Sequence, residues 1–329
     1  MPHRRLAGRL LSSVALIAAL NGCGEGIPPR TDVRIGVFQV QDFLPYFVMQ
    51  EEGLDARNGL RFVEQSFSGG AAALQAMAEG SLDVSPGVAI VPILTAAERG
   101  LVPSKVVWVA VNDVADPDHP GVALLVSHSV QDWKDLSGQK IAVNARDSVT
   151  AAAVDVRLKD EGVVGHSFVN IPFSNMGLAV AGGNVAAAGM NEPYFTQSLL
   201  RRDGRLLDWV VGGRPFERTQ FTGIVFSTAF HRSNPAIVKG YLRAHLAAVK
   251  WINANPEKGR LLLARRLNLS PDVAKSVHLL RWPLDARIDP ALLSQAQQVL
   301  VRAKLLREPG ATAQLYDETL LAEVLKEKL

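Results

Sequence analysis

Short apolar runs alternate with longer segments of helical spacing along most of the chain after residue 31. The run at 32–38 is apolar first on alternate positions and then throughout, which is typical of a strand that enters a core. The segment 235–254 instead repeats its apolar residues with a period of about 3.6, which predicts one long amphipathic helix. The alternation of the two patterns predicts an α/β fold.

The same patterns locate the other elements. Pro86-Gly87 is expected to break the chain after the third strand, and the chain from Ala229 onward is expected to be helical. We expect strands at 32–38, 61–66, 82–85, 105–111, 122–127, 141–143, 168–171, 185–190, 206–210 and 221–227. We expect helices at 44–52, 69–79, 88–99, 146–160, 176–181, 191–203, 235–254, 257–267, 271–280 and 290–305.

The stretch 62–84 combines a strand, a Ser-Gly-Gly turn, an Ala-rich helix, a Gly stop and a further strand. Ser68 is expected to cap the helix, because its hydroxyl can accept from a first-turn N–H. Gly69 and Gly70 leave the backbone open to close approach, and Gly80 suits the left-handed residue that ends a helix. The turn therefore offers N–H groups to an anion. The alternative is a solvated helix end without a ligand.

This order of elements returns roughly a hundred residues later in the chain. The matching segments are Arg34–Val37 with Lys140–Val143, Glu52–Leu54 with Glu161–Val163, Phe67-Ser68 with Phe173-Ser174, and Ala78–Leu82 with Ala181–Val185. Two copies are too few for a solenoid. They predict two α/β lobes that face each other.

Composition and charge narrow the function classes. The chain has 329 residues, 48% of them apolar and 20% charged, which suits a globular protein of two domains. The formal charge is +3, and Arg4, Arg5 and Arg9 account for all of it. No basic run or basic-aromatic stripe is present, so the sequence excludes a nucleic-acid partner.

The three arginines begin a leader. An apolar run at 10–20 is too short to span a membrane, and Leu20-Asn21-Gly22-Cys23 resembles the lipobox of bacterial lipoproteins. We therefore predict a lipoprotein signal peptide at 1–22, lipidation at Cys23 and a tether at 23–31. The alternative is an ordinary secretory signal with an unrelated cysteine. Either way the protein is exported, and with one cysteine it has no internal disulfide.

Several motifs, in this order and spacing, resemble the bacterial solute-binding proteins of ABC transporters, in the sulfonate, nitrate, taurine and pyrimidine-precursor class. The motifs are Phe67–Leu74, Gly80–Val84, Asp135–Val143 and Asn191–Tyr194. The resemblance covers nearly all of the chain after residue 31. It implies the two-lobed periplasmic-binding-protein (type II, Venus flytrap) fold, each lobe a mixed sheet flanked by helices. Lobe one would hold 31–125 plus 226–329, and lobe two 126–225.

Two departures bear on the ligand. Members often carry an aromatic residue where this chain has Met190-Asn191 before Glu192-Pro193. The loop at 39–41 has no lysine or arginine that would fix an anion directly. The sequence therefore points to the class of protein more firmly than to one ligand.

Ligands of open α/β sheets bind beyond the carboxyl ends of the strands. This rule nominates as ligand-binding Gln39, Gln41, Phe43, Ser68, Gly69, Gly70, Ser85, Gly87, Asn112, Asp113, Arg146, Ser148, Thr150, Asn175, Asn191, Glu192 and Tyr194.

Structural roles are the alternative at several of these positions. Gln39 and Gln41 could be solvated loop residues, and Ser148 and Thr150 could only cap their helix. Arg146 could pair with its neighbour, Tyr194 could belong to the lobe core, and Glu192 could stabilise the start of a helix.

The resemblance implies an extracytoplasmic solute-binding component of an ABC importer, lipid-anchored on the outer side of the cell membrane and monomeric. Its partners would be a permease, its ATPase and a small ligand, either a sulfonate of the taurine type or a pyrimidine- or flavin-type heterocycle. The ligand would shift a hinge between open and closed states. We expect no catalytic residue, metal or cofactor, because the seven histidines are scattered. The alternative is an enzyme of the same fold that acts on a pyrimidine or quinone precursor.

Overall fold

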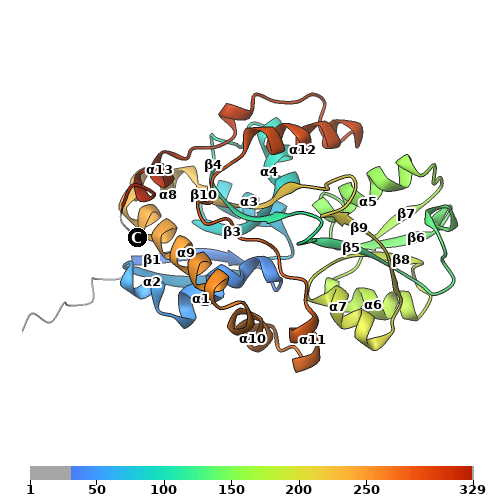
Figure 1. The fold of residues 1–329 in the computed structure, drawn as a ribbon. Helices are drawn as coiled ribbons and strands as arrows, with labels where there is room; N and C mark the ends of the chain where they lie inside the picture. The colour runs from blue at the N-terminus through green and yellow to red at the C-terminus, as the bar shows by residue number, and fades with distance from the viewer. Residues whose placement is uncertain (1–30, 328–329) are drawn as a thin grey trace, which may run out of the picture.

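The computed structural model describes residues 31–327, which form two five-stranded sheets lying side by side (Figure 1). The predicted leader, the lipidation site Cys23 and the tether, apart from Thr31, lie outside these residues. Helices flank both sheets, and we call the part built on each sheet a lobe. The predicted fold class, two lobes that each hold a mixed sheet between helices, is confirmed.

The first sheet has the spatial order β2-β1-β3-β10-β4. β1 pairs in parallel with β2 and β3, whereas β10 pairs antiparallel with β3 and β4. The strands are β1 (Thr31–Val37), β2 (Leu60–Ser66), β3 (Val84–Ala89), β4 (Val106–Ala115) and β10 (Thr219–Ser227).

The second sheet repeats this arrangement in the order β7-β6-β8-β5-β9. β6 pairs in parallel with β7 and β8, and β5 pairs antiparallel with β8 and β9. The strands are β5 (Val122–Val126), β6 (Lys140–Val143), β7 (Ser167–Asn170), β8 (Ala187–Asn191) and β9 (Arg205–Val211). The internal repeat inferred from the sequence is therefore confirmed, since β1, β2 and β3 correspond to β6, β7 and β8.

The α-helices flank these sheets (Figure 1). They are α1 (Leu44–Glu51), α2 (Leu54–Arg57), α3 (Gly70–Ala78), α4 (Ile90–Glu98), α5 (Val149–Asp160), α6 (Phe173–Ala181), α7 (Tyr194–Arg201), α8 (Thr228–Ser233), α9 (Pro235–Ala254), α10 (Pro256–Leu267), α11 (Pro271–Ser276), α12 (Pro290–Arg302) and α13 (Thr319–Val324). Short 3-10 helices are η1 (Gln41–Phe43), η2 (Trp133–Leu136) and η3 (Thr312–Gln314). The long helix expected at 235–254 is confirmed to the residue as α9.

Pro86 and Gly87 lie inside β3, so the break expected after the third strand is wrong. Opposite this dipeptide, the pairing of β3 with β10 shifts register between Gly223 and Val225. Such an irregularity leaves residues outside the ladder and so tolerates proline, which has no N–H. Glycine is required next to it, because a Cβ at Gly87 would lie 2.4 Å from the Phe43 ring.

Other boundaries differ at the ends of elements. The helix expected at 271–280 ends at Ser276, and the N–H of Leu280 instead donates to Gln41 Oε1 at 3.2 Å. The strand expected at 105–111 continues to Ala115, because it pairs along its length with β10. The helix expected at 290–305 ends at Arg302.

The helices that follow β10 pack on the first lobe, as their apolar stripes predict. α9 contacts α1 and α13, and α12 contacts α4 (Figure 1). Two of these helices also reach the second lobe, since α12 contacts α5 and α11 contacts α7. The C-terminal third therefore completes the first lobe and holds the second lobe from two sides.

The chain crosses between the sheets twice, at 116–121 and at 212–218. The two crossings lie side by side, and at their edge the N–H of Gly121 donates to the carbonyl of Val211, the last residue of β9, at 2.9 Å. Gly212 has φ +83, and a Cβ there would lie 2.5 Å from Pro120 Cα. This close packing makes the crossings one paired connection.

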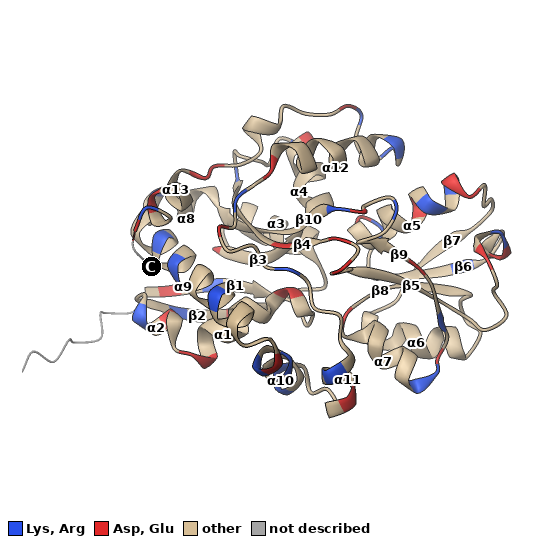
Figure 2. Ribbon diagram, viewed as in Figure 1, with Lys and Arg blue, Asp and Glu red and all other residues tan. Residues whose placement is uncertain are grey.

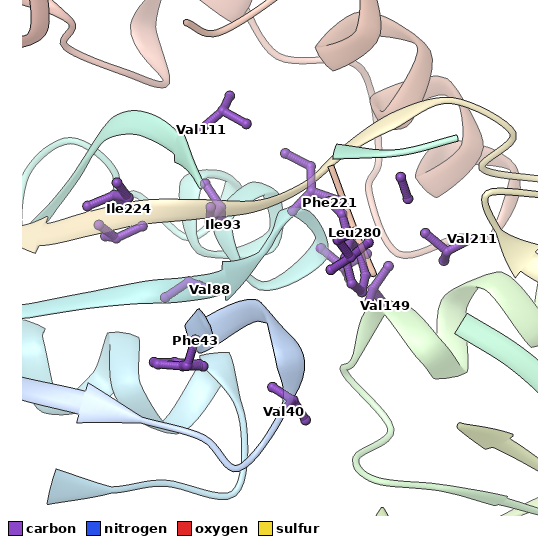
Figure 3. Close-up of a cluster of buried hydrophobic side chains, with 14 of the residues drawn as sticks. Val40, Phe43, Val88, Ile93, Val111, Val149, Val211, Phe221, Ile224 and Leu280 are labelled. Atoms are coloured by element: carbon purple, nitrogen blue, oxygen red, sulfur yellow. The ribbon is translucent and has the colours of Figure 1, made fainter. Parts of the chain in front are cut away.

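A cluster of buried apolar side chains continues from the first sheet to the second (Figure 3). Val40, Phe43 and Phe221 belong to the first lobe, and Val149 and Val211 belong to the second. The two lobes therefore meet through apolar contact beside the crossings, and burial of this surface favours keeping them together.

Charges of both signs are interspersed along the ribbon of both lobes (Figure 2). Within residues 31–327, no helix combines the length and the hydropathy that crossing a membrane requires.

Candidate functional site

A cavity of about 640 Å³ lies between the two lobes. The first lobe lines it with the loop after β1 and the start of α3, and the second lobe with the starts of α5 and α6. Its volume falls within the range of about 300–1,000 Å³ that is usual for small-molecule sites.

The start of α3 presents unpaired backbone N–H groups to this cavity. The residue before the helix is Gly69, and no side chain caps the helix, so the cap expected from Ser68 is wrong. Among the described residues, no protein acceptor bonds the N–H of Gly70, Ala71 or Ala72. A helix start that leaves these donors unmet carries a positive potential and suits an anion.

The helices α5 and α6 begin at the same cavity. Ser148 Oγ caps α5 by accepting from the N–H of Ala151 at 3.2 Å. α6 follows Pro172, and no side chain caps it. Three helix starts from two lobes therefore face one space, which concentrates the partial positive charge of their N–H groups there.

The charged side chains that line the cavity are both acidic. They are Asp42 and Asp147, and the lining includes no lysine, arginine or histidine. Arg146 is next in sequence, but its Nη2 donates to the carbonyl of Phe168 at 2.9 Å. The expected alternative pairing of Arg146 with Asp147 is therefore not formed, and an anion in the cavity would depend on backbone N–H groups.

The structure places about half of the nominated residues at the cavity. Those that line it are Gln39, Ser68, Gly69, Gly70, Gly87, Ser148, Thr150, Asn191 and Tyr194. Contact with a ligand remains a prediction for each of them. They come from both lobes, as the rule on the carboxyl ends of strands requires.

The other nominated residues lie outside the lining: Gln41, Phe43, Ser85, Asn112, Asp113, Arg146, Asn175 and Glu192. Phe43 is part of the apolar cluster, and the hydroxyl of buried Ser85 donates to the carbonyl of Gly36 at 3.0 Å. Asn175 is exposed on α6. Ser85, Asn112 and Asp113 lie within β3 and β4 and not beyond a strand end, so the expected strand ends were placed too early. Their side chains are buried inside the first lobe, which residue type alone does not reveal.

Glu192 is fully buried and joins the two lobes away from the cavity lining. Its Oε1 accepts from Thr196 Oγ1 at 2.7 Å and from His278 Nδ1 at 2.9 Å. Its Oε2 accepts from the N–H of Thr196 at 3.1 Å, at the start of α7. These contacts give Glu192 the structural role at a helix start that the sequence left open.

Tyr194 also spans the lobes, but at the cavity. Its hydroxyl donates to the carbonyl of Gln39 at 2.9 Å, and its ring stacks on Phe173 with centroids 5.9 Å apart. Burial raises the pKa of Tyr194, so the phenol keeps its proton and remains a donor. The side chain is thus more than part of the lobe core.

Two buried carboxyl groups, Asp42 and Asp113, lie beside each other, and Asp42 lines the cavity whereas Asp113 does not. Asp113 accepts from Thr222 Oγ1 at 2.8 Å and from Asn112 Nδ2 at 2.7 Å. Oδ2 of Asp42 is buried without a hydrogen-bond partner among the described residues. Burial raises the pKa of Asp42 to about 7. Burial and the neighbouring Asp42 hold the pKa of Asp113 well above its usual range.

Several lining residues were not predicted from the sequence, among them Asp42, Asn144, Phe173 and Phe221. Asn144 directly follows β6, so the rule on strand ends could have found it. Phe221 lies within β10, and no sequence signal marks a residue in mid-strand as facing a cavity. Within residues 31–327, no group of three or more His, Cys, Asp or Glu is placed to hold a metal ion.

Known proteins resemble this chain both in sequence family and in fold. A family model described as the NMT1-like family matches residues 26–267. No curated protein sequence matches the chain significantly.

Solved structures share the fold over nearly the whole chain. The alkanesulfonate-binding protein SsuA from Xanthomonas axonopodis pv. citri, bound to MOPS, is 19% identical, with a TM-score of 0.67 over 90% of this chain and 98% of that one. The periplasmic nitrate-binding protein NrtA from Synechocystis PCC 6803 is 14% identical, with a TM-score of 0.72 over 90% and 89%. The desulfurization enzyme DSZB is 17% identical, with a TM-score of 0.65 over 90% and 99%. The fold is that of periplasmic binding proteins, and the resemblance drawn from the sequence is confirmed.

Proposed function

The chain belongs to the NMT1-like family, and on that basis we propose that it is the extracytoplasmic solute-binding component of an ABC importer. The observation that carries this proposal is the cavity between the lobes, where the starts of α3, α5 and α6 converge. A site assembled from two hinged halves closes on its ligand, and the closed form is then the form that a permease recognises.

The ligand class follows from the donors. A sulfonate or similar oxyanion accepts several hydrogen bonds, and the uncapped starts of α3 and α6 supply N–H groups without a full positive charge. Fold relatives that bind an alkanesulfonate and nitrate support an anionic ligand. A pyrimidine- or flavin-type heterocycle remains the second ligand class to test.

Delivery to a permease requires export, so the segments before the first lobe must direct the protein across the membrane. We propose a signal peptide at 1–22, lipidation of Cys23 and a tether that holds a monomer at the membrane. The lobe bounds expected from the sequence, 31–125 plus 226–329 and 126–225, misplace two strands, because β5 pairs in the second sheet and β10 pairs in the first. We propose instead that the lobes divide where the chain leaves each sheet, near 116–121 and 212–218. Mass spectrometry of the mature N-terminus tests the lipidation, since an unmodified Cys23 would contradict it.

Binding rather than catalysis is proposed, although DSZB shows that the fold also supports an enzyme. The lining contains Ser68, Ser148 and Ser174, but no histidine, cysteine or lysine joins them there. A hydroxyl without an adjacent base is a weak nucleophile. The lining thus lacks the histidine, cysteine and lysine that most often serve as nucleophile or base, which supports the proposal of binding.

A charge placed at the start of α3 tests the proposal. Ala72 is exposed on the first turn and lines the cavity, whereas Gln75 lies one turn further and does not. We expect Ala72→Glu to weaken binding of a sulfonate by at least about tenfold, because the new carboxylate repels it and takes the free N–H groups. Isothermal titration calorimetry measures the change.

Gln75→Glu is the matched control, because it adds the same charge to the same helix away from the cavity. We expect its affinity to stay within about twofold of wild type. A thermal-shift screen of sulfonates, pyrimidines and flavins selects the ligand, since a bound ligand raises the melting temperature. Absence of binding by every member of the screen would overturn the proposed function.

A further inference from the structure

After α11 the chain returns to the first sheet through an irregular segment, residues 277–282, which we call the brace. α11 contacts α7 of the second lobe, and the brace leads from there back to β4 of the first lobe (Figure 1). The brace therefore passes from one lobe to the other without being a strand of either sheet.

The brace is anchored to the first lobe. The N–H of Val114 donates to the carbonyl of Arg281 at 2.8 Å, and the N–H of Leu280 donates to Gln41 Oε1 at 3.2 Å. Arg281 Nε donates to Asp116 Oδ2 at 3.2 Å, and Asp116 begins the first of the two crossings. These bonds fix the brace relative to the first sheet and to the connection between the lobes.

The other end of the brace contacts the second lobe through His278. Its Nδ1 donates to Glu192 Oε1 at 2.9 Å, and its backbone N–H donates to the same oxygen at 3.3 Å. Its ring packs edge-on against Trp209 of β9, with the centroids 5.2 Å apart and the ring planes at 66°. His278 therefore joins the anchored brace to the second lobe.

The burial of Glu192 gives this contact its weight. Glu192 is fully buried, and its other two donors are the N–H and the hydroxyl of Thr196, which belongs to the same lobe. When the lobes separate, the carboxylate keeps Thr196 and loses both donors of His278. A carboxylate is stable away from water only when donors surround it, so the contact with His278 favours the closed form.

The contact lies outside the cavity between the lobes. Neither His278 nor Glu192 is among the residues that line it. A contact that exists only in the closed form and does not touch the ligand stabilises that form equally with and without ligand. It therefore multiplies the ratio of closed to open molecules by the same factor in both cases.

We propose that the brace holds part of the ligand-free protein in the closed form, through the bond between His278 and Glu192. This inference rests on the proposed function, because it needs lobes that open and close. It adds a device outside the cavity that sets the resting conformation. His278 is then a positioning residue, which acts on the lobes and not on the ligand.

Single-molecule fluorescence with one dye on each lobe measures the ratio of closed to open molecules. The dyes are attached at Glu79→Cys and Asp160→Cys, two exposed positions outside the cavity, in a Cys23→Ser background. We expect His278→Ala to lower the ratio at least about fivefold, because it removes a donor to a buried carboxylate. The factor should be the same without ligand and with butanesulfonate present.

Matched variants separate this effect from a general loss of structure. His278 is half-exposed, so its replacement is expected to leave the fold intact. His278→Asn keeps a donor and should restore the ratio to within about twofold of wild type. His128→Ala removes a histidine whose Nε2 contacts the carbonyl of Arg202 at 3.3 Å within the second lobe, and it should leave the ratio unchanged. If His278→Ala does not fold, His278→Phe replaces it, since it keeps a ring against Trp209 and lacks the donor.

The outcomes distinguish the brace from the function on which it rests. Absence of closed molecules in the ligand-free wild type would overturn the brace, and so would an unchanged ratio in His278→Ala. A decrease that appears only with butanesulfonate would also overturn it, because His278 would then act through the ligand. Failure of butanesulfonate to bind would count against the proposed ligand class and leave the brace standing. A single fixed conformation in every protein would overturn both proposals.

Discussion

Asp42 and Asp113 are buried acidic residues, and burial raises the pKa of both carboxyl groups. Their proximity increases the effect on Asp113, because two neighbouring carboxylates repel each other. Near neutral pH the pair therefore holds protons that the same groups lose in the unfolded chain. The stability of the ligand-free protein should depend on pH through this pair.

Rising pH destabilises the folded protein through Asp42. The pKa of Asp42 rises from 3.8 to about 7 on folding, so the folded state binds more protons between these values. The stabilising contribution is complete below about pH 4 and is lost as the pH rises through about 7. We expect Asp42→Asn to gain about 2 kcal/mol over wild type between about pH 5 and about pH 7.

Urea denaturation of the ligand-free protein at several pH values measures this gain. Asp160→Asn serves as the control, because an exposed carboxylate contributes little to stability. Parallel stability curves for wild type and Asp42→Asn would contradict the prediction.

The sequence predicted some of the residues that line the cavity. The rule that ligands lie beyond the carboxyl ends of strands found Gln39, Ser148 and Asn191, which line the cavity. It nominated Gln41 and Phe43 but passed over Asp42, whereas in the 3-10 helix at 41–43 Asp42 is the residue that lines the cavity. Local turns of this kind depend on tertiary packing, and a period counted along the chain cannot supply them.

At the scale of elements, two helix starts with a serine behave differently. Ser148 is the N-cap of α5 and accepts from Ala151, whereas α3 begins one residue later than expected, with Gly69 in the capping position. Ser68 is a preferred capping residue, but the glycines after it let the chain turn into the helix without its side chain. The capping residue type was therefore a weaker guide than the turn that follows it.

This difference gives a matched pair of variants. Ser148→Ala removes a cap and is expected to lower the free energy of unfolding by about 1 kcal/mol. Ser68→Ala removes no cap and is expected to change it by less than about 0.5 kcal/mol. Chemical denaturation of both variants is the measurement, and equal losses would contradict the assigned caps.

The order of strands and helices was predictable because two signals agreed. Apolar runs located the strands, and the repeat of Arg34–Val37 at Lys140–Val143 showed that β1 and β6 are equivalent. The break expected at Pro86-Gly87 failed because an irregular register with β10 accommodates the proline. β10 lies far from β3 in the sequence, so no local sequence pattern predicts this pairing.

At the scale of the whole molecule, few polar contacts join the lobes across the cavity. Tyr194 donates to Gln39, and Glu192 binds His278 beyond the lining. These bonds form only when the lobes are together, so they belong to the closed side of the proposed equilibrium. A change in one of them should alter ligand affinity more than it alters folding.

Tyr194→Phe tests this separation, because it removes the hydroxyl and keeps the ring against Phe173. We expect the affinity for the ligand selected by the screen to fall by about threefold to tenfold, in line with the loss of one hydrogen bond. Small-angle X-ray scattering of the ligand-free variant should show a larger radius of gyration than wild type.

Tyr46→Phe is the control within one lobe, since that hydroxyl donates to Glu64 Oε1 at 2.6 Å inside the first lobe. Its ligand affinity is expected to match wild type, whatever its effect on stability. Equal affinities for all three proteins would show that the contact of Tyr194 does not contribute to closure.

The paired crossings at 116–121 and 212–218 have a consequence for how such movement can be followed. If the lobes open and close as proposed, two connecting segments that run side by side would act as a hinge with one preferred rotation axis. The angle between the lobes would then be enough to describe the change from the open to the closed conformation. One pair of fluorescent dyes, with a dye on each half, would therefore track the complete cycle of one molecule in real time.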